Sequence, residues 1–232
     1  MSRPENATAL VTGASKGIGR ATALRLSRDY EIVAVARSEQ DLASLAREIE
    51  GSGGTCRSLT VDITDPVAVD SALSGIEAQV LINNAGVGYL KPFLELTRDE
   101  WRQMVDVNFN ALYDVTRALL PTMVARRSGH VVVIGSISGR SAFVGGSCYA
   151  ATKHAVMAFT ECLMLEVREA GVKVSVVNPG SVATGFSKRR AESSWALSAE
   201  DVADAVAHVL STPANVLIHR VEVRTLTPPK KS

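Results

Sequence analysis

A short stretch near the N-terminus decides the fold: Thr12-Gly13-Ala14-Ser15-Lys16-Gly17-Ile18-Gly19. Its first residue, Thr12, is also the last residue of the apolar segment 7–12. An apolar run that ends in closely spaced glycines is typical of a buried strand turning tightly into a helix. Glycine lets backbone N–H groups approach a phosphate, and the positive end of the following helix stabilises its charge. The spacing G-x-x-x-G-x-G differs from G-x-G-x-x-G and from the P-loop. It still predicts a phosphate-binding turn, with contacts from Gly13, Ser15, Lys16, Gly17, Ile18 and Gly19.

The same turn allows a second interpretation. Gly13-Ala14-Ser15-Lys16-Gly17 matches G-x-S-x-G, the nucleophile elbow of α/β hydrolases, in which Ser15 would attack the substrate. That elbow needs an upstream loop that supplies an oxyanion-hole N–H, and only twelve residues precede Gly13 here. We therefore expect phosphate binding rather than hydrolysis.

Outward from this turn, strand-like and helix-like segments alternate along the chain. Several strand segments are continuously apolar, as expected of parallel strands covered on both faces. Helix starts are indicated at Ser38, Thr97 and Ser198, each followed three residues later by an acidic residue. The alternation predicts an α/β fold: a single-domain doubly wound parallel sheet of the Rossmann type, with about seven strands and helices on both faces. The expected strands are residues 7–12, 31–36, 55–61, 80–82, 130–135, 173–177 and 216–223.

The overall composition excludes several function classes. Lys and Arg number 25 against 24 Asp and Glu, so a broad charged surface for nucleic acid or an anionic membrane is not expected. The three cysteines form no C-x-x-C pair, which predicts a reducing environment and no metal site. Apolar runs are far shorter than the roughly 18 residues of a membrane span. We expect a cytoplasmic protein in which residues 1–232 form one domain, with residues 228–232 as a loose C-terminal tail.

The end of the second expected strand bears on the choice of dinucleotide. Arg37 follows Ala36 at the place where an NAD site has an acidic residue for the ribose 2′-hydroxyl. A carboxylate would repel a 2′-phosphate, whereas Arg37 can bind one through paired charge-assisted hydrogen bonds, and Lys16 adds a second positive charge. Glu39 nearby keeps open the alternative that Arg37 is only a solvated residue. The charges favour NADP(H) as the cofactor.

Tyr149 and Lys153 form a candidate acid–base pair. They lie four residues apart in a helix-like stretch, so they share one helix face. The ordinary tyrosine pKa is about 10, and a neighbouring ammonium lowers it, which makes the phenol usable as an acid or base. Ser136 and Ser138 follow a buried strand, at the sheet edge where α/β proteins bind ligands. Either hydroxyl can bind a substrate carbonyl or simply cap a turn.

Taken together, these motifs resemble those of the short-chain dehydrogenase/reductase family over nearly the whole chain. Residues 12–19 resemble its TGxxxGxG turn, and residues 83–86 resemble its NNAG segment. The Asn-Ser-Tyr-Lys tetrad of the family is matched in order and spacing by Asn108, Ser136, Tyr149 and Lys153. The segment that holds the nicotinamide is matched by Asn178-Pro179-Gly180, Val182 and Thr184.

The resemblance implies a role for each matched residue. Tyr149 would exchange a proton with the substrate oxygen, and Ser136 would orient that oxygen. Lys153 would lower the tyrosine pKa and, together with Tyr149, contact the nicotinamide ribose, while Asn108 would hold a water for proton relay. Lys16 and Arg37 match positions linked with NADP preference in the family. The other implied cofactor contacts are Asp62 and Ile63 at the adenine, Asn83, Ala85 and Gly86 near the adenosine, Pro179 and Gly180 in the turn, and Val182 and Thr184 at the carboxamide.

Only a short segment separates the Pro179-Gly180 turn from the helix start at Ser198, so we expect residues 185–197 to form a short substrate lid. Candidate substrate contacts are Ser138, Phe186 and Trp195. The basic triplet Lys188-Arg189-Arg190 could attract an anionic substrate, although charge runs usually face water.

The sequence therefore predicts an NADP(H)-dependent oxidoreductase with Tyr149 as the general acid/base. It would transfer a hydride between the nicotinamide and a small ketone, aldehyde or secondary alcohol. The alternative is a non-catalytic NADP(H)-binding sensor or scaffold of the same fold, which would not need the complete tetrad. The resemblance also implies a homotetramer or homodimer, with helices around residues 108–126 and 149–170 at the interfaces.

Overall fold

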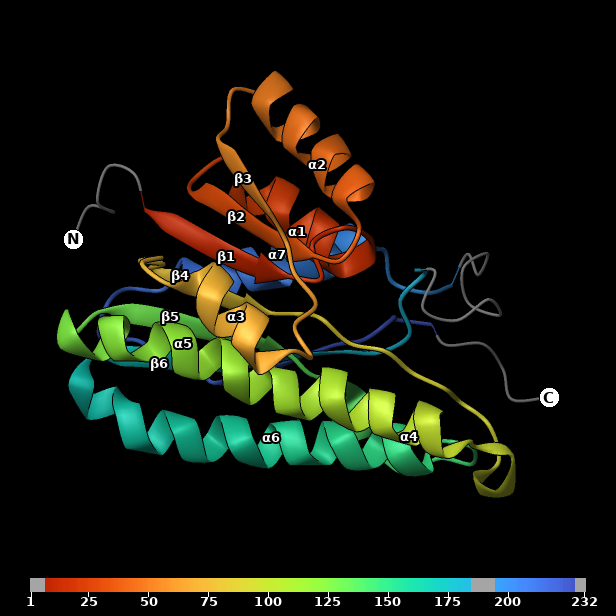
Figure 1. The fold of residues 1–232 in the computed structure, drawn as a ribbon. Helices are drawn as coiled ribbons and strands as arrows, with labels where there is room; N and C mark the ends of the chain where they lie inside the picture. Colours follow the sequence, from red (N-terminus) through yellow and green to blue (C-terminus); the bar gives the residue numbers. More distant parts are fainter. Residues whose placement is uncertain (1–6, 185–194, 228–232) are drawn as a thin grey trace.

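Seven parallel strands form one sheet in the computed structural model, which describes residues 7–184 and 195–227 (Figure 1). Their order across the sheet is β3-β2-β1-β4-β5-β6-β7. The chain thus runs outward from β1 to β3 and then returns to the other side of β1, which leaves a crevice at the carboxyl ends of β1 and β4. The strands are β1 (Thr8–Thr12), β2 (Glu31–Ala36), β3 (Cys56–Thr60), β4 (Val80–Asn83), β5 (Gly129–Ile134), β6 (Val172–Pro179) and β7 (Arg220–Val223).

Helices cover both faces of this sheet, which confirms the predicted fold class. One face packs against α3, α5 and α6, and the other against α1, α2 and α7 (Figure 1). Successive strand residues point to opposite faces, so Val131 and Val133 join the first core cluster while Val132 and Ile134 join the second. The helices are α1 (Gly17–Leu26), α2 (Glu39–Gly51), α3 (Pro66–Leu73), α4 (Arg98–Val105), α5 (Ala111–Ala125), α6 (Ser147–Val167) and α7 (Ala199–Leu210).

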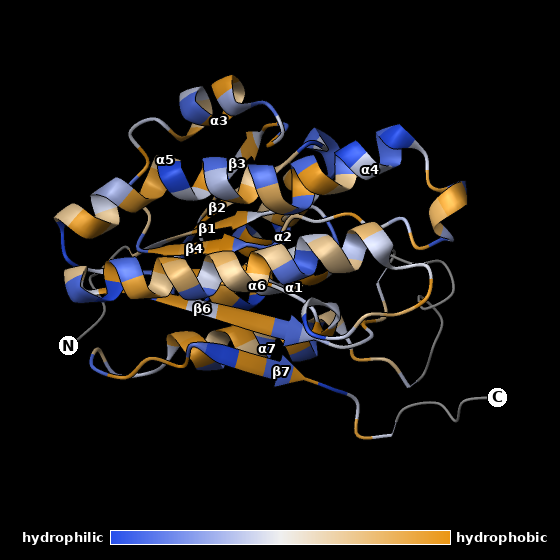
Figure 2. Ribbon diagram, turned by 90° about the horizontal axis from the view of Figure 1, so that it is seen from below, coloured by the Kyte–Doolittle hydropathy of each residue, from blue (hydrophilic) through white to orange (hydrophobic). Residues whose placement is uncertain are grey.

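Strands such as β2 and β5 are apolar along most of their length because both faces are covered (Figure 2). The edge strands β3 and β7 carry more polar residues and are less buried. In β5, five consecutive residues from His130 to Ile134 are buried. The helices instead show apolar and polar faces, as amphipathic packing on a sheet requires. In the described ranges, no helix combines the length and apolarity that crossing a membrane requires.

Helix starts follow the predicted capping pattern at two of three places. At Thr97 and at Ser198 the hydroxyl accepts the N3 backbone N–H, and the N3 carboxylate accepts the N-cap N–H in return. At Ser38 only the first bond forms, from Asp41 N to Ser38 Oγ at 3.3 Å. The Asp41 carboxylate instead lies 3.2 Å from Lys16 Nζ.

Two features of the fold differ from the sequence-based expectation. Strand β7 begins at Arg220 rather than at Val216, because Val216 N donates to Pro213 O and the chain turns there. A π-helical segment, Asp106–Asn110, separates α4 from α5. The other expected strands differ from the observed ones by at most two residues at either end.

Candidate active site

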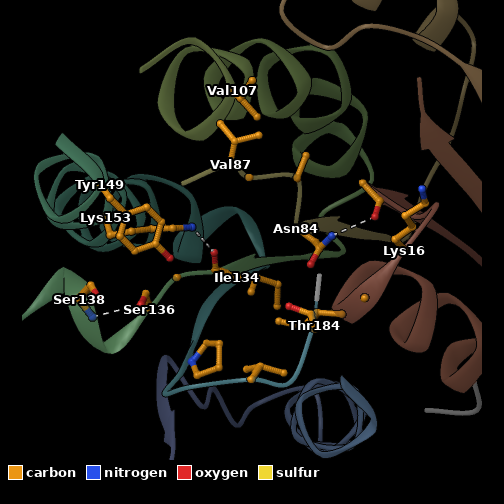
Figure 3. Close-up of a pocket in the computed structure, with 18 of the residues that line it drawn as sticks. Lys16, Asn84, Val87, Val107, Ile134, Ser136, Ser138, Tyr149, Lys153 and Thr184 are labelled. Atoms are coloured by element: carbon orange, nitrogen blue, oxygen red, sulfur yellow. Dashed lines mark hydrogen bonds between the residues drawn. The ribbon is translucent and has the colours of Figure 1, made fainter. Parts of the chain in front are cut away.

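A cavity of about 650 Å³ lies at the carboxyl ends of the strands, lined by the segments that follow β1 to β6 (Figure 3). Most residues that the sequence singled out meet here, although they come from the segments after six different strands and from α6. The predicted site residues that line the cavity are Gly13, Ser15, Lys16, Gly17, Ile18, Arg37, Asp62, Ile63, Ala85, Gly86, Ser136, Ser138, Tyr149, Lys153, Pro179, Gly180, Val182 and Thr184.

The turn between β1 and α1 requires its glycines. Gly13 and Gly17 have φ of +65° and +55°, a backbone region that favours glycine. A Cβ on Gly19 would lie 2.2 Å from the Gly13 carbonyl oxygen, so the first helical turn can pack against the loop only without a side chain. Gly19 does not itself line the cavity, and it acts by allowing this close packing.

Thr12 and Asn84 tie this turn to the loop after β4. Thr12 Oγ1 accepts hydrogen bonds from the N–H groups of Asn84 and Ala85, both at 3.1 Å. The Asn84 side chain donates to the carbonyls of Thr12 and Gly13 at 2.9 and 3.3 Å. Sequence reasoning gave Asn84 no role, although it stands inside the quoted NNAG segment.

The neighbouring residue Asn83 lies deeper than the resemblance implies. Its side chain is buried and donates to Thr116 Oγ1 on α5 at 3.0 Å. It does not line the main cavity and so connects the sheet to α5. The two asparagines of the NNAG segment point to opposite sides because they continue the alternation of a strand.

Lys153 is the most buried charged residue of the site. It is 6% exposed, and its Nζ donates to the backbone carbonyl of Ile134 at 3.0 Å (Figure 3). Burial lowers the pKa of Lys153 from 10.5 to about 8. The same Nζ lies 5.9 Å from the centre of the Tyr149 ring, one turn earlier on α6. The predicted pair therefore shares one helix face and reaches into the cavity together.

Asn108 lies in the π-helical segment and is 3% exposed. Its Oδ1 accepts the N–H of Val87 at 2.8 Å, and its Nδ2 donates to Val87 O and to Thr152 Oγ1 at 3.0 and 3.1 Å. A Cβ on Gly86 would lie 3.3 Å from Asn108 Oδ1 and 3.8 Å from Lys153 Nζ. Asn108 thus fixes the loop after β4 against α6 beside the ammonium, and it does not line the main cavity.

Ser136 both caps a turn and faces the cavity. Its Oγ accepts the N–H of Ser138 at 3.1 Å, which starts the 3-10 turn Ile137–Gly139. Its own N–H donates to Asn178 Oδ1 at 3.1 Å. A Cβ on Gly135 would lie 2.1 Å from that oxygen, so glycine makes room for the contact. Asn178 is a positioning residue that sequence reasoning quoted beside Pro179 but did not assign.

The opposite end of the cavity carries Lys16, Arg37 and Asp62. The Lys16 side chain is 78% exposed and pairs with Asp41 at 3.2 Å. Partial burial opposes ionisation of Asp62, but hydrogen bonds from Thr64 and the charge of Arg37 together hold its pKa below the ordinary value. This end is therefore open and charged, with two basic side chains near the N-terminus of α1.

The remaining candidates fall outside the cavity or outside the described residues. Trp195 lies at a turn before Leu197, whose N–H donates to Ser181 O at 2.9 Å, and it does not line the cavity. Phe186 and the Lys188-Arg189-Arg190 triplet, with most of the expected lid, lie outside the described residues, as does the expected tail. Among residues 7–184 and 195–227, no group of three or more metal-ligating side chains could hold a metal ion.

Comparisons with known proteins identify the family. A family model described as short chain dehydrogenase matches residues 7–195. The chain is 38% identical over 192 residues to dehydrogenase/reductase SDR family member 7B of Mus musculus, which covers 78% of this chain and 59% of that protein. It is 33% identical over 237 residues to the NADP-dependent 3-hydroxy acid dehydrogenase YdfG of Salmonella typhi, with 94% of each protein covered.

A solved structure agrees with these relatives. The crystal structure of a metagenomic short-chain oxidoreductase in complex with NADP has a TM-score of 0.85 and 32% sequence identity to this chain. The match covers 95% of this chain and 98% of that one. The motifs, the sheet order and the comparisons agree, and the chain therefore belongs to the short-chain dehydrogenase/reductase family of oxidoreductases.

Proposed function

We propose that this protein is an NADP(H)-dependent oxidoreductase that interconverts a ketone or aldehyde and the corresponding alcohol. The observation that carries the proposal is the meeting of Tyr149, Lys153 and Ser136 at one end of a cavity whose other end holds Lys16 (Figure 3). Arg37, which follows β2, lines the same cavity. The distribution of charge fits NADP(H). Basic side chains and a helix N-terminus suit its phosphates, and a buried ammonium suits a site of proton transfer. When bound, the nicotinamide supplies or accepts the hydride.

The residues of this chain supply the proton and orient the carbonyl. Tyr149 gives its phenolic proton to the carbonyl oxygen as the alcohol forms, and it takes that proton back in the reverse direction. The Lys153 ammonium, 5.9 Å from the ring centre, stabilises the phenolate that remains. The Ser136 oxygen already accepts the N–H of Ser138, which leaves the Ser136 O–H to donate to the carbonyl oxygen. Asn178 keeps Ser136 in place through its backbone N–H.

Removing the phenolic hydroxyl tests the chemistry. Tyr149→Phe should lower kcat by about 10²- to 10⁴-fold, the usual contribution of a positioned general acid, while the dissociation constant of NADPH changes little. Tyr113→Phe makes the same substitution on the exposed face of α5 and is the matched control. NADPH consumption against a panel of carbonyl compounds and fluorescence titration of NADPH measure the two quantities. Full turnover by Tyr149→Phe would refute the proposed acid, and NADPH binding by wild type without any turnover would support the sensor alternative.

The preference for NADP(H) over NAD(H) is proposed from Lys16 and Arg37. It agrees with the NADP-dependent relative from Salmonella typhi and with the metagenomic oxidoreductase that was solved in complex with NADP. Arg37→Asp replaces a side chain that can bind a 2′-phosphate by one that repels it. The ratio of kcat/KM for NADPH to that for NADH should then invert. An unchanged ratio would mean that Arg37 does not contact the 2′-phosphate.

We propose, further, that the protein acts in the cytoplasm as a homodimer or homotetramer. Cys56, Cys148 and Cys162 are unpaired, as expected in a reducing compartment. The exposed apolar side chains Val124 on α5 and Leu165 on α6 lie on the helices expected at the interface. Light scattering after size-exclusion chromatography tests the assembly, and a monomeric mass at micromolar concentration would contradict it.

A further inference from the structure

The two ends of the cavity differ in charge. Lys16, Arg37 and Asp62 follow β1, β2 and β3, whereas the loops after β4 and β5 form the far end. In Figure 3, Lys16 lies on the opposite side of the pocket from Tyr149 and Ser138. We define this far end, beyond Tyr149, as the substrate end. Its lining residues are apolar or carry a neutral hydroxyl: Leu90, Ile137, Ser138, Ser141, Ala142 and Phe143.

The basic residues next to this lining already form ion pairs with acidic side chains. Lys91 follows Leu90 in the chain, and its Nζ lies 2.6 Å from Glu100. Arg140 precedes Ser141, and its guanidinium lies 3.2 Å from Glu222, which Arg224 also approaches to 3.1 Å. The two loops adjoin, because a Cβ on Gly145 would lie 3.5 Å from the Lys91 backbone. Within the described residues, Lys153 is therefore the one cation that lines this end of the cavity, and it faces the reacting group.

Apolar surface continues from the substrate end toward the solvent. Phe143 lines the cavity and is still 39% exposed, so its ring can lose further contact with water when a ligand enters. A carboxylate placed here would lose its hydration without gaining a free cation, which is costly. An alkyl or aryl group placed here would gain the hydrophobic contribution of the area that it buries.

On the basis of the function proposed above, we infer that the substrate is an uncharged carbonyl compound with an apolar substituent held by Leu90 and Phe143. This substrate class differs from the one in the name of the relative from Salmonella typhi, which is a 3-hydroxy acid. We expect the enzyme to reduce a neutral ketone, an aldehyde or the ester of an oxo acid in preference to the free oxo acid, which carries a negative charge at neutral pH. Each carbonyl reduced to an alcohol consumes one NADPH and one proton.

Paired substrates test the inference directly. Methyl 3-oxohexanoate and 3-oxohexanoate carry the same reacting carbonyl, and at one end they differ in charge and by a single methyl group, whose burial alone would account for about fourfold. At pH 7 the ester should have a kcat/KM at least tenfold higher than the acid. Lengthening the ester by one methylene should raise kcat/KM about fourfold as long as the added group is buried. A kcat/KM for the acid equal to or above that for the ester overturns the inference and leaves the proposed function intact, whereas no reduction of any carbonyl compound overturns both.

Equilibrium binding provides a readout that does not depend on turnover. The Tyr149→Phe variant saturated with NADPH should bind the ester at least tenfold more tightly than the acid, as measured by isothermal titration calorimetry. Equal dissociation constants would overturn the inference even if the rates differed.

Three sets of variants locate the preference. Phe143→Ala and Leu90→Ala should each lower kcat/KM for the longest ester by about tenfold, because less apolar area is buried. Leu94→Ala is the matched control, since Leu94 lies close in the same loop but is 95% exposed and does not line the cavity. Replacing Lys188, Arg189 and Arg190 together by Ala should leave the ratio of ester to acid unchanged. A rise in that ratio through loss of acid turnover would show that the triplet recruits anionic substrates and would contradict the inference.

Discussion

Lys16 and Lys153 line the same cavity and differ mainly in how far water reaches them. The Lys16 side chain is 78% exposed and its Nζ lies 3.2 Å from the Asp41 carboxylate. Lys153 is 6% exposed and donates to a backbone carbonyl, and none of the described acidic side chains forms an ion pair with it. Water screens the first charge, whereas the protein interior strengthens the electrostatic effect of the second. Burial therefore makes one ammonium suitable for holding a phosphate and the other for controlling a proton.

The largest effect is expected when the buried ammonium is removed. Lys153→Met keeps much of the length and apolar packing of the side chain but leaves Tyr149 without its neighbouring charge. We expect kcat/KM to fall by about 10²- to 10⁴-fold, the range for loss of acid–base function. Steady-state kinetics measure this loss, with circular dichroism as the control for folding. A fall of less than fivefold would show that the buried ammonium of Lys153 does not control the proton transfer.

The pH dependence of stability sharpens the same contrast. The pKa of Lys153 is 10.5 in the unfolded chain and about 8 in the folded protein, so below pH 8 both states are protonated and folding carries the full cost of burying the charge. Between pH 8 and 10.5 the unfolded chain binds more protons. The contribution of Lys153 to the free energy of unfolding should therefore rise by about 3 kcal/mol across this window.

Urea denaturation of wild type and Lys153→Met at several pH values between 7 and 10.5 measures this change. The difference between the two proteins cancels the titration of the groups that do not interact with Lys153. Wild type should gain stability relative to the variant as the pH rises. A constant difference would mean that the buried ammonium keeps its ordinary pKa.

A smaller effect is expected at the exposed lysine. Lys16→Ala removes one of the two positive charges proposed to face the 2′-phosphate. Exposed charge pairs contribute up to about 1 kcal/mol, so the dissociation constant of NADPH should rise by no more than about fivefold. The dissociation constant of NADH, which lacks the 2′-phosphate, is the internal control and should not change. Equal weakening of both cofactors would show that Lys16 does not discriminate between them.

The smallest effect, with the opposite sign, is expected at Asp41. The Asp41 carboxylate competes with an anionic ligand for Lys16. The pKa of Asp41 is lowered most by a hydrogen bond with Ser38 and next by the interaction with Lys16. Asp41→Asn should tighten NADPH binding by about twofold, within the range for a surface ion pair. In the double variant with Lys16→Ala this gain should disappear, since the pair no longer exists. Persistence of the gain would place the effect of Asp41 elsewhere.

Much of the fold could be predicted from local patterns. Short β-branched and apolar runs predicted the strands to within two residues except at β7, where Pro213 begins a turn that these runs do not reveal. The spacing of Thr97 and Glu100 predicted a reciprocal cap that the structure contains. The same prediction at Ser38 was only half correct, because the Asp41 carboxylate forms an ion pair with Lys16, more than twenty residues away in the sequence.

The positions of individual site residues were less predictable. Gly19 and Asn83 belong to the motifs that carry the resemblance, yet neither lines the cavity. Asn108 occupies a π-helical segment that helical periodicity does not indicate, and both groups of its amide are bound by Val87 and Thr152. Such hydrogen bonds join segments that are distant in the sequence, so they depend on how the helices pack on the sheet.

The sequence by itself determined the alternation of strands and helices, the glycine turn after β1 and the shared face of Tyr149 and Lys153. These features follow from short-range sterics and from the periods of strand and helix, which a few neighbouring residues establish. Only the tertiary structure decided that Lys153 is buried against the Ile134 carbonyl, that Asn178 holds Ser136, and that the cations near the substrate end are paired. Burial and ion pairing depend on distances between remote segments, and packing of the whole chain sets those distances.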